Sequence, residues 1–479
     1  KFHSRLVFYY ACDMGSGASP GIRIAVQSSS TDELHAVLAG LSDAARARLV
    51  SVLQDARCKP PTIPATLDEV DAEFVTSALK DRGYIQENTR ITSLEKIKFG
   101  REKGYLGDKC LLKDITYKPS SPEAPGSIFV KLFPTDLVIP VASCARMWHM
   151  EVHFVTRMLK DLPDSSDFKV PQFYFTGWDA EEGKPPRCVL LMEPMSENPY
   201  DIFTGMPVEH ALRAAKDLAI LHAPYWGWSY SRFREETDKR GLKKFEGCGH
   251  MEDAGQKQGF QGLFNMGSRL GPPIFGADGP LSAAQLEDFS GYVEFWKFWE
   301  AEIWSPLQKR WGAVLARFTS IPATLAHGDF HVENMFCFED GTNAYIDWQA
   351  VKLGPGTRDL AWLLVSSLKA EERREHEKTI AKAYHEALMA RGVINYAWEQ
   401  CWEDFVLMKI HGLWAAMLGA GIFADKNFKE KTGIFAPEPS DDSILERRRN
   451  CVLFSRIVDD MRHSNWPAML QSLPEDPEA

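Results

Sequence analysis

Apolar residues recur at helical spacing in some stretches of the chain and form short strand-like runs in others. In 67–83 they lie three and four positions apart and the pattern ends in glycine, which predicts an amphipathic helix. Two shorter helices are expected within 30–56, before the proline-rich linker 58–66. A further helix is expected over 147–162. Strand-like runs lie at 91–100, 109–118, 127–133, 169–179 and 187–195.

After this mixed stretch the pattern becomes mostly helical. A helix over 207–226 begins with proline near its start. Long helical patterns follow at 284–318, 359–391, 396–420 and 441–471. The glycine-rich interval 240–280 is too long for a plain connection and is either a functional loop or an insertion. We therefore expect three regions: an N-terminal extension with linker at 1–66, a strand-rich unit at 67–195 and a helical unit at 196–479.

Composition and charge narrow the function classes. The formal net charge of −11 argues against a nucleic-acid or anionic-membrane partner, because those surfaces require a dense basic face. The nine cysteines include no C-x-x-C pair, which indicates reduced thiols in a cytosol-like compartment and no zinc site. No apolar run reaches the ~20 residues of a membrane span. We expect a cytoplasmic protein; because the chain begins at Lys1, organelle import after N-terminal processing stays open.

The most informative stretch is 325–349, "LAHGDFHVENMFCFEDGTNAYIDWQ". Asp329 follows a short apolar run, and Asn334 and Asp347 lie beside two further strand-like segments. In a strand–loop–strand arrangement Asn334 and Asp347 converge, and an oxygen-rich pair suits Mg²⁺, which takes its other ligands from phosphates and water. Asp329 is then free to accept a proton from a substrate hydroxyl. The stretch predicts a magnesium-dependent phosphoryl-transfer site.

The order catalytic Asp, metal Asn, metal Asp is that of kinases. The pattern H-G-D-x-x-x-x-N, the following I-D-W-Q and "GPGTRDLAWLL" (354–364) resemble the aminoglycoside phosphotransferase and choline kinase group. "LAILHAPYWGWS" (218–229) resembles its ecdysteroid kinase-like (CHK kinase-like) branch. The resemblance implies a protein-kinase-like two-lobed α+β fold, with a small β-rich N-lobe, a mainly helical C-lobe and a helical N-terminal extension. H-R-D and D-F-G are missing, which makes a protein kinase a poor alternative.

The resemblance also assigns roles to residues. It implies ATP and Mg²⁺ as cofactors, Asp329 as the catalytic residue and Asn334 with Asp347 as metal ligands. His327 and Asp359 would support the catalytic loop structurally.

The upstream half of the chain offers matching positions for a nucleotide. A lone lysine, Lys131, lies in the apolar run "SIFVKLF", where it needs a partner, and Glu151 lies twenty residues on in the expected helix. Taken singly, Lys131 also fits an edge strand and Glu151 a solvated helix face. The segment from Met192 to Met195 resembles the hinge that holds adenine through its backbone. The glycines 100, 104 and 107 do not form G-x-G-x-x-G, so the contacts that cover the phosphates stay undefined.

Candidates for the acceptor side are His331, His411 and Trp414. His331 either faces the acceptor or fills a gap beside the loop. The aromatic stretch 291–304 either binds a quaternary ammonium by cation–π contact, as in choline-type kinases, or is buried in the helical core, which is the more common fate of such stripes. An apolar and aromatic lining would suit a hydrophobic alcohol such as a sterol or another lipid-like compound.

Two functions follow from these positions. The first is an ATP-dependent enzyme that moves the γ-phosphoryl group to a hydroxyl of a small molecule. The alternative is a catalytically silent pseudokinase that acts as a structural subunit of a larger assembly, with residues 1–60 as a surface for protein partners. Every expected catalytic position is filled, which favours the enzyme.

Overall fold

The structure of the protein is a computed structural model. It describes residues 61–99, 107–133, 150–159, 162, 168–179, 187–195, 200–239, 261–262, 264–271, 289–424 and 441–477. Several expectations lie outside these residues: the extension 1–60, glycines 100 and 104, and most of the interval 240–280. Within the described part, no helix has the length and apolar character needed to cross a membrane.

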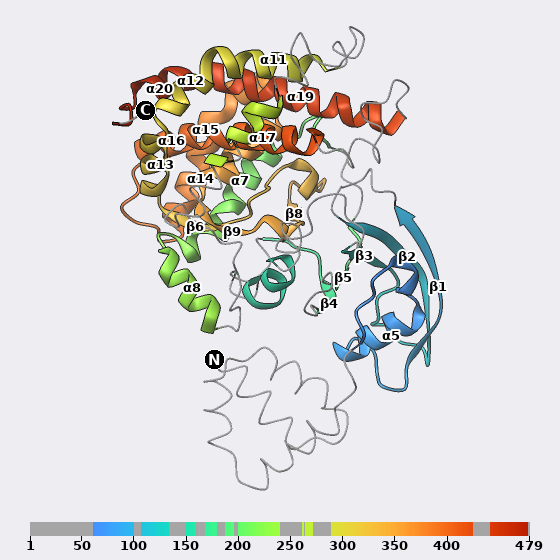
Figure 1. Ribbon diagram of the computed structural model, residues 1–479. Coiled ribbons are helices and arrows are strands. Elements are labelled where there is room, and N and C mark those ends of the chain that lie inside the picture. Colours follow the sequence, from blue (N-terminus) through green and yellow to red (C-terminus); the bar gives the residue numbers. More distant parts are fainter. Residues whose placement is uncertain are drawn as a thin grey trace.

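The strand-rich lobe is a five-stranded antiparallel sheet with the order β1-β2-β3-β5-β4. Its strands are β1 (Arg90–Phe99), β2 (Asp108–Lys118), β3 (Ile128–Leu132), β4 (Phe173–Asp179) and β5 (Arg187–Met192). The helix predicted over 67–83 is α5 (Ala72–Asp81), preceded by the short turn Leu67–Glu69. Asp71 caps α5 by accepting a hydrogen bond from the Phe74 amide. Figure 1 shows α5 lying against the sheet.

The two faces of the sheet are buried differently. On one face, α5 packs Phe74, Val75 and Leu79 against the buried strand residues of β2, β3 and β5. On the other face, Leu190 and Met192 pack against Val152 of the helix that contains Glu151. That helix begins within the described residues at 150 and continues as a π-helical turn from Phe154 to Met158. The sheet is therefore covered on the face that also bears the Lys131 partner.

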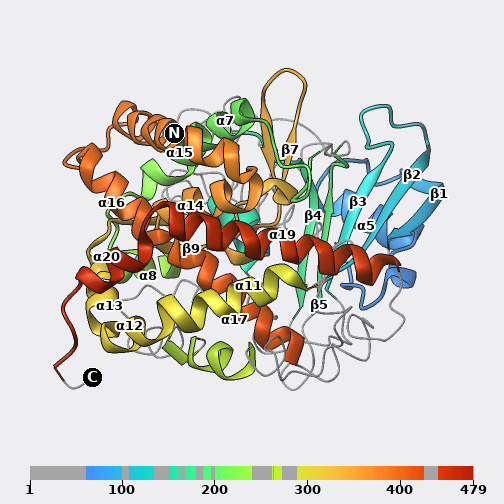
Figure 2. The same cartoon turned by 90° about the horizontal axis from the view of Figure 1, so that it is seen from above.

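The second lobe is helical, as the sequence predicts. Figures 1 and 2 show its helices gathered beside the sheet, with α19 running across the lobe. Its main helices are α7 (Val208–His222), α8 (Tyr230–Lys239), α11 (Ser290–Phe298), α12 (Trp304–Lys309), α13 (Trp311–Ser320), α14 (Thr357–Ser367), α15 (Ala370–Ala390), α16 (Trp398–Met408), α17 (Ile410–Ala424), α19 (Asp441–His463) and α20 (Trp466–Ser472). Each long pattern predicted from the sequence is divided into two or three shorter helices.

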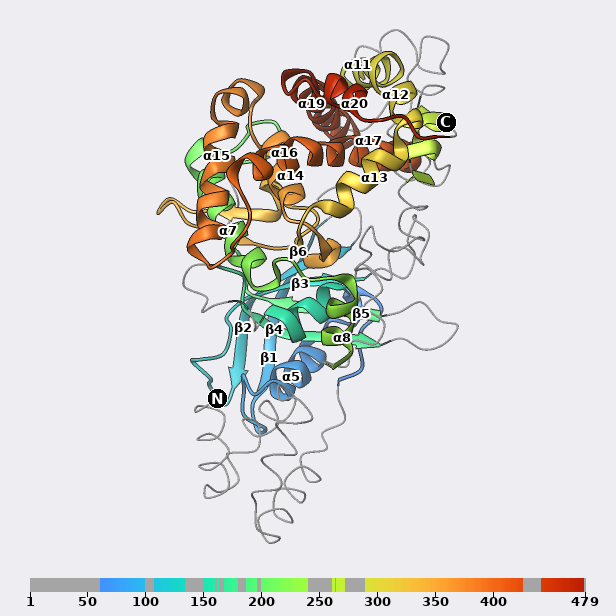
Figure 3. The same cartoon turned by 90° about the vertical axis from the view of Figure 1, so that its left-hand side faces the viewer.

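Two small strand pairs lie between the sheet and the helices. β6 (Ala323–Ala326) pairs with β9 (Lys352–Pro355), and β7 (Met335–Cys337) pairs with β8 (Asn343–Tyr345). They carry the segment 325–349 into the region where the two lobes meet (Figure 3). The architecture is the predicted two-lobed, kinase-like α+β fold, with a β-rich lobe followed by a mainly helical one.

Candidate active site

One ammonium group joins three distant parts of the chain. Lys131 Nζ of β3 lies 2.8 Å from Glu151 Oε2 and 2.8 Å from Asp347 Oδ1. The second oxygen of Glu151 accepts a hydrogen bond from the Trp348 amide at 3.2 Å. Glu151 therefore holds both the lysine and the backbone that follows Asp347. Lys131 and Glu151 are buried, whereas Asp347 is partly exposed.

The charges explain why a lysine is stable inside this strand. Burial by itself lowers the pKa of Lys131, but the carboxylates of Asp347 and Glu151 outweigh burial and raise that pKa above its ordinary value. Lys131 is consequently a cation at neutral pH. The contact between Lys131 and Asp347 also fixes the position of Asp347 relative to the sheet, since the backbone of Lys131 is paired with β2 on one side and β5 on the other.

Three residues of the segment 325–349 have positive φ, and two of them, Gly328 and Asp347, adjoin the candidate site. Gly328 has φ +87°, and a Cβ there would lie 2.1 Å from the carbonyl oxygen of Ala350. Asp347 is not glycine, yet it has φ 66° and ψ 63°. Such a conformation costs a non-glycine residue of the order of 1–3 kcal/mol and persists only where neighbouring contacts hold it. The contact of Asp347 with Lys131, and the hydrogen bond that the next amide, of Trp348, donates to Glu151, supply that restraint.

The catalytic-loop carboxylate is held at both of its oxygens. Trp362 Nε1 of α14 donates to Asp329 Oδ1 at 3.0 Å. The Asn334 amide nitrogen donates to Asp329 Oδ2 at 3.2 Å and to the Asp329 carbonyl at 2.8 Å. His331 Nε2 lies 3.5 Å from Asp329 Oδ2. These contacts orient the carboxylate, which keeps 38% of its side chain exposed.

The electrostatics favour the ionised form of Asp329. Burial raises the pKa of this carboxyl, but the interactions led by the contact with His331 outweigh burial and bring the pKa below its ordinary value. A carboxylate of low pKa is a weak base and a good acceptor of a hydrogen bond from a hydroxyl. In phosphoryl transfer most of the rate comes from positioning, so a carboxylate that orients the hydroxyl does not need to be a strong base.

Asp359 supports the loop from behind. Its Oδ2 accepts the His327 amide at 2.6 Å and its Oδ1 accepts the Gly328 amide at 2.9 Å. His222 of α7 lies 3.4 Å from Oδ2 and also contacts the Tyr384 hydroxyl at 2.8 Å. His222 thus bonds within the helical lobe, and Asp359 contacts the backbone of the loop at His327 and Gly328.

His327 connects the two halves of the segment. Its Nε2 bonds to the Ile346 carbonyl at 3.0 Å, and its Nδ1 accepts the Asp329 amide at 3.4 Å. This pattern requires the neutral Nε2–H tautomer. Burial lowers the pKa of His327, which agrees with a neutral ring. His327 therefore ties the backbone just before Asp347 to the backbone of Asp329.

The oxygens that face away from these contacts could bind a metal ion. Asn334 donates through its nitrogen, and within the described part of the chain its Oδ1 has no hydrogen-bond donor. Asp347 uses Oδ1 for Lys131, and its Oδ2 likewise has no donor there. The described residues contain no group of three or more His, Cys, Asp or Glu that could enclose a metal by themselves. Two free oxygens suit Mg²⁺, which keeps water and phosphate ligands.

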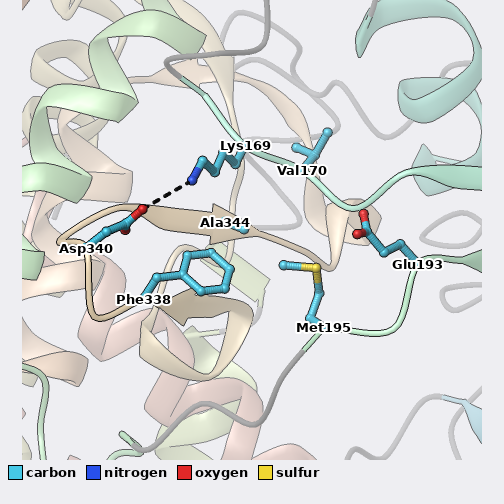
Figure 4. A pocket seen from close by; sticks show the side chains of 7 residues that line it. All are labelled: Lys169, Val170, Glu193, Met195, Phe338, Asp340 and Ala344. Carbon is cyan, nitrogen blue, oxygen red and sulfur yellow. Dashed lines mark ion pairs between the residues drawn. The ribbon is translucent and has the colours of Figure 1, made fainter.

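The predicted hinge lies at the end of β5. Met192 is buried, and its backbone is in register with Phe129 and Phe173. Met195 lines a pocket of about 370 Å³. Figure 4 shows this pocket between the segment that follows β5 and the β7–β8 hairpin, with the Lys169–Asp340 ion pair at its edge. Its lining does not include Lys131, Asp329, Asn334 or Asp347; it comprises Lys169, Val170, Glu193, Met195, Phe338, Asp340 and Ala344.

The expected acceptor-side residues lie on the helical side of Asp329. His331 contacts Asp329, and its Nδ1 is buried without a hydrogen-bond partner. His411 of α17 is buried, and its ring stacks on Trp414 at 5.2 Å. The aromatic stretch 291–304 belongs to the helical core, which was the second of the two alternatives considered for it. Its rings are buried in the helical core: Phe295, Trp296 and Trp299.

Three contributors to the site were not singled out from the sequence. Trp362 lies three residues after Asp359, on the same face of α14, which is the helical spacing that would have identified it. Arg358 donates to the Gly328 carbonyl at 3.3 Å. Glu333 of the loop bonds to Arg449 of α19, with Arg449 Nε 2.9 Å from Glu333 Oε1. No local pattern marks the last pair, because its members are 116 positions apart.

Comparison with known proteins adds a family match over part of the helical lobe. Residues 311–430 match the family DUF1679, whose description is "Uncharacterized oxidoreductase dhs-27". This range contains the catalytic loop, Asp347 and α14. No curated protein matches the chain.

Several solved structures of small-molecule kinases are similar to this chain. A choline kinase from Cryptosporidium parvum has 10% identity and a TM-score of 0.45, covering 84% of this chain and 99% of its own. A GDP complex of an aminoglycoside 2'-phosphotransferase has 13% identity and a TM-score of 0.40, covering 76% and 98%. A Plasmodium vivax ethanolamine kinase has 14% identity and a TM-score of 0.38, covering 82% and 95%.

Proposed function

We propose that this protein is an ATP-dependent phosphotransferase that phosphorylates a hydroxyl group of a small molecule. The observation that carries the proposal is the contact of Lys131 with both Glu151 and Asp347. The two carboxylates keep Lys131 charged and hold its ammonium group in place, and phosphate oxygens are a natural third partner for that group. The two free oxygens of Asn334 and Asp347 lie on the same segment and suit Mg²⁺.

In the proposed reaction the phosphoryl group passes directly from ATP to the substrate, and the protein forms no covalent bond with it. The substrate hydroxyl oxygen attacks the γ-phosphorus, the bond from that phosphorus to the bridging oxygen breaks, and ADP leaves. Asp329 accepts a hydrogen bond from the hydroxyl, orients it and takes its proton. Lys131 neutralises charge on the phosphates, and Glu151 holds Lys131 in position. Mg²⁺, held by Asn334 and Asp347, would supply neutralisation of phosphate charge.

A silent structural subunit is the alternative raised by the sequence. No observation in the described part of the chain favours it, because each position needed for transfer bears a suitable side chain with its partners in reach. The amine- and aminoglycoside-directed kinases among the similar structures support phosphoryl transfer to a small molecule in general. They do not identify the acceptor of this chain.

Two measurements test the proposal in sequence. Calorimetric titration with Mg·ATP should show binding to the wild type that Asp347→Ala abolishes and that Glu339→Ala retains. Glu339 is the control because it is an exposed acidic residue of the β7–β8 turn and does not line the pocket beside Met195. A mixture of hydroxyl-bearing metabolites is then incubated with Mg·ATP and searched for compounds that gain one phosphoryl mass, with Asp329→Asn as the blank. Absence of nucleotide binding by the wild type would exclude the proposal.

A further inference from the structure

A wall of ring side chains leads away from Asp329 into the helical lobe. It begins at Trp362, whose indole nitrogen binds Asp329. The His411 ring lies 5.1 Å from the Trp362 ring, and Trp414 stacks on His411 with an interplanar angle of 24°. These three residues belong to α14 and α17, whereas Lys131 lies on the sheet. The wall therefore adjoins Asp329 and belongs to the helical lobe, whereas the proposed phosphate contact Lys131 belongs to the sheet.

Arg358 is a cation beside this wall. It is 9% exposed, its guanidinium carbon lies 5.5 Å from the centre of the Trp414 ring, and its Nη2 reaches the Gly328 carbonyl. Both ring nitrogens of His411 lie within 3.4 Å of the guanidinium. A neutral imidazole can accept at only one of them.

The protein leaves part of this guanidinium unmatched. A guanidinium has five N–H donors, and the described residues offer it one carbonyl and one imidazole acceptor. Nη1 makes no hydrogen bond with the described residues and is not sealed inside the protein. No carboxylate of the described part of the chain forms an ion pair with Arg358. Buried cations are ordinarily paired, because desolvation costs several kcal/mol per ion.

Two cations, Arg358 and Lys352, lie beside the Trp414 ring. Burial lowers the pKa of Arg358 to about 10, with Asp359 and Asp329 opposing that shift only in part, so the group is still a cation at neutral pH. The His411 ring is neutral there, because burial and the charges of Arg358 and Lys352 lower its pKa. The Lys352 ammonium lies 5.6 Å from the centre of the Trp414 ring, which adds a second positive charge on the same wall.

We propose that the acceptor is an alcohol carrying an anionic group, a carboxylate or a phosphate, which binds Arg358 while the hydroxyl meets Asp329. This inference rests on the proposed function and names its substrate class. A guanidinium presents parallel N–H donors that fit a carboxylate or phosphate. The apolar faces of Trp414 and Trp362 would pack against the carbon chain between the two ends. An acceptor bearing an amine would instead meet the positive charges of Arg358 and Lys352.

The test uses four six-carbon alcohols that differ only in the terminal group: 6-hydroxyhexanoate, 6-hydroxyhexyl phosphate, 6-hydroxyhexanamide and 6-amino-1-hexanol. Their dissociation constants are measured by calorimetry on the full chain with a non-hydrolysable Mg·ATP analogue bound. We expect an anionic alcohol to bind roughly 10- to 100-fold more tightly than the amide, and the amine most weakly. The preferred anion distinguishes a carboxylate site from a phosphate site.

Variants then tie the preference to one side chain. Arg358→Gln should remove the discrimination between anion and amide while leaving the affinity for the amide within about twofold, and Arg358→Lys should keep part of the discrimination. Arg391→Gln, at an exposed arginine after α15, is the charge-matched control and should behave as the wild type. A merely structural role for Arg358 would weaken all four alcohols equally.

The outcomes separate this inference from the proposed function. Failure of both anions to bind more tightly than the amide and the amine, including failure of all four to bind, overturns the inference. A loss of Mg·ATP affinity in Arg358→Gln also overturns it, since the arginine would then serve the nucleotide. In either case the proposed function stands or falls separately, by Mg·ATP binding that depends on Asp347.

Discussion

Lys131 and Asp347 are 216 positions apart in the chain, and their side chains are 2.8 Å apart in the structure. Glu151 completes the triplet with a second contact of 2.8 Å to the same ammonium. Under the proposed function, Lys131 combines a stability role with a nucleotide-binding role, and substitutions can separate the two.

Lys131→Met should lower the free energy of unfolding by about 3–5 kcal/mol, because it leaves Glu151 buried without its cation. Adding Glu151→Gln should restore much of that stability, since glutamine can still accept the Trp348 amide. Mg·ATP affinity should stay low in both variants. Urea unfolding and calorimetry measure the two effects, with Lys113→Met on β2 as the control. Recovery of nucleotide affinity in the double variant would contradict the assigned role of Lys131.

Two glycines provide a matched pair of backbone tests. Gly328 and Gly341 both have positive φ, but only at Gly328 would a Cβ meet a backbone atom, the Ala350 carbonyl. Gly341→Ala should cost about 1–2 kcal/mol from its conformation alone. Gly328→Ala should cost clearly more and should also reduce Mg·ATP binding, because the loop must shift. Thermal unfolding and nucleotide titration of the two variants check this. Equal costs would show that the strand behind Gly328 can move freely.

The Glu333–Arg449 pair should couple the catalytic loop to α19. Arg449 Nε lies 2.9 Å from Glu333 Oε1, and both side chains are about three-quarters buried. We expect Glu333→Gln and Arg449→Met each to destabilise the fold, and the double variant to lose less than their sum. A coupling of about 0.5–3 kcal/mol is expected from a double-mutant cycle in urea. Strict additivity would mean that the pair does not hold the loop.

A buried ionic cluster should dominate the stability of the helical lobe. Lys409 Nζ lies 2.9 Å from Glu377 Oε2 and 2.8 Å from Asp460 Oδ1, and all three residues are buried. Lys409→Met leaves two carboxylates with one cation fewer and should cost about 3–5 kcal/mol. Lys382→Met, on the exposed face of α15, should stay close to the wild type. Chemical denaturation distinguishes these outcomes, and a loss similar to that of the control would argue against the cluster.

Asp404 should make stability depend on pH. Burial raises its pKa from 3.8 to about 6, although the Tyr396 hydroxyl and Arg317 oppose the shift. The carboxyl has the ordinary pKa of 3.8 in the unfolded state and a pKa of about 6 in the folded state. Between pH 4 and pH 6 the folded state therefore binds more protons than the unfolded state, so the free energy of unfolding falls as the pH rises through about this range. Asp404→Asn should remove this part of the slope, whereas Glu399→Gln on the same helix should retain it. Parallel slopes for wild type and Asp404→Asn would refute the assignment.

The local spacing of the sequence was enough to identify the fold class and the segment 325–349. His327, Asp329, Asn334 and Asp347 lie within 21 consecutive positions, and their roles depend on one hairpin whose strands are adjacent in the chain. Lys131 stood out for a different reason, because a lysine in an apolar strand signals a missing partner. The amphipathic patterns likewise predicted the order of strands and helices.

The contacts that assemble the candidate site come from residues far apart in the chain, and their positions depend on how the helices pack. Arg358 and His411 are 53 positions apart, and Glu333 and Arg449 are 116 apart. Periodicity reports which face of an element is buried and does not report which element covers it. The stacking of α14 against α17 and the course of α19 therefore determined the surroundings of Asp329, because each side chain's partner is set by three-dimensional proximity.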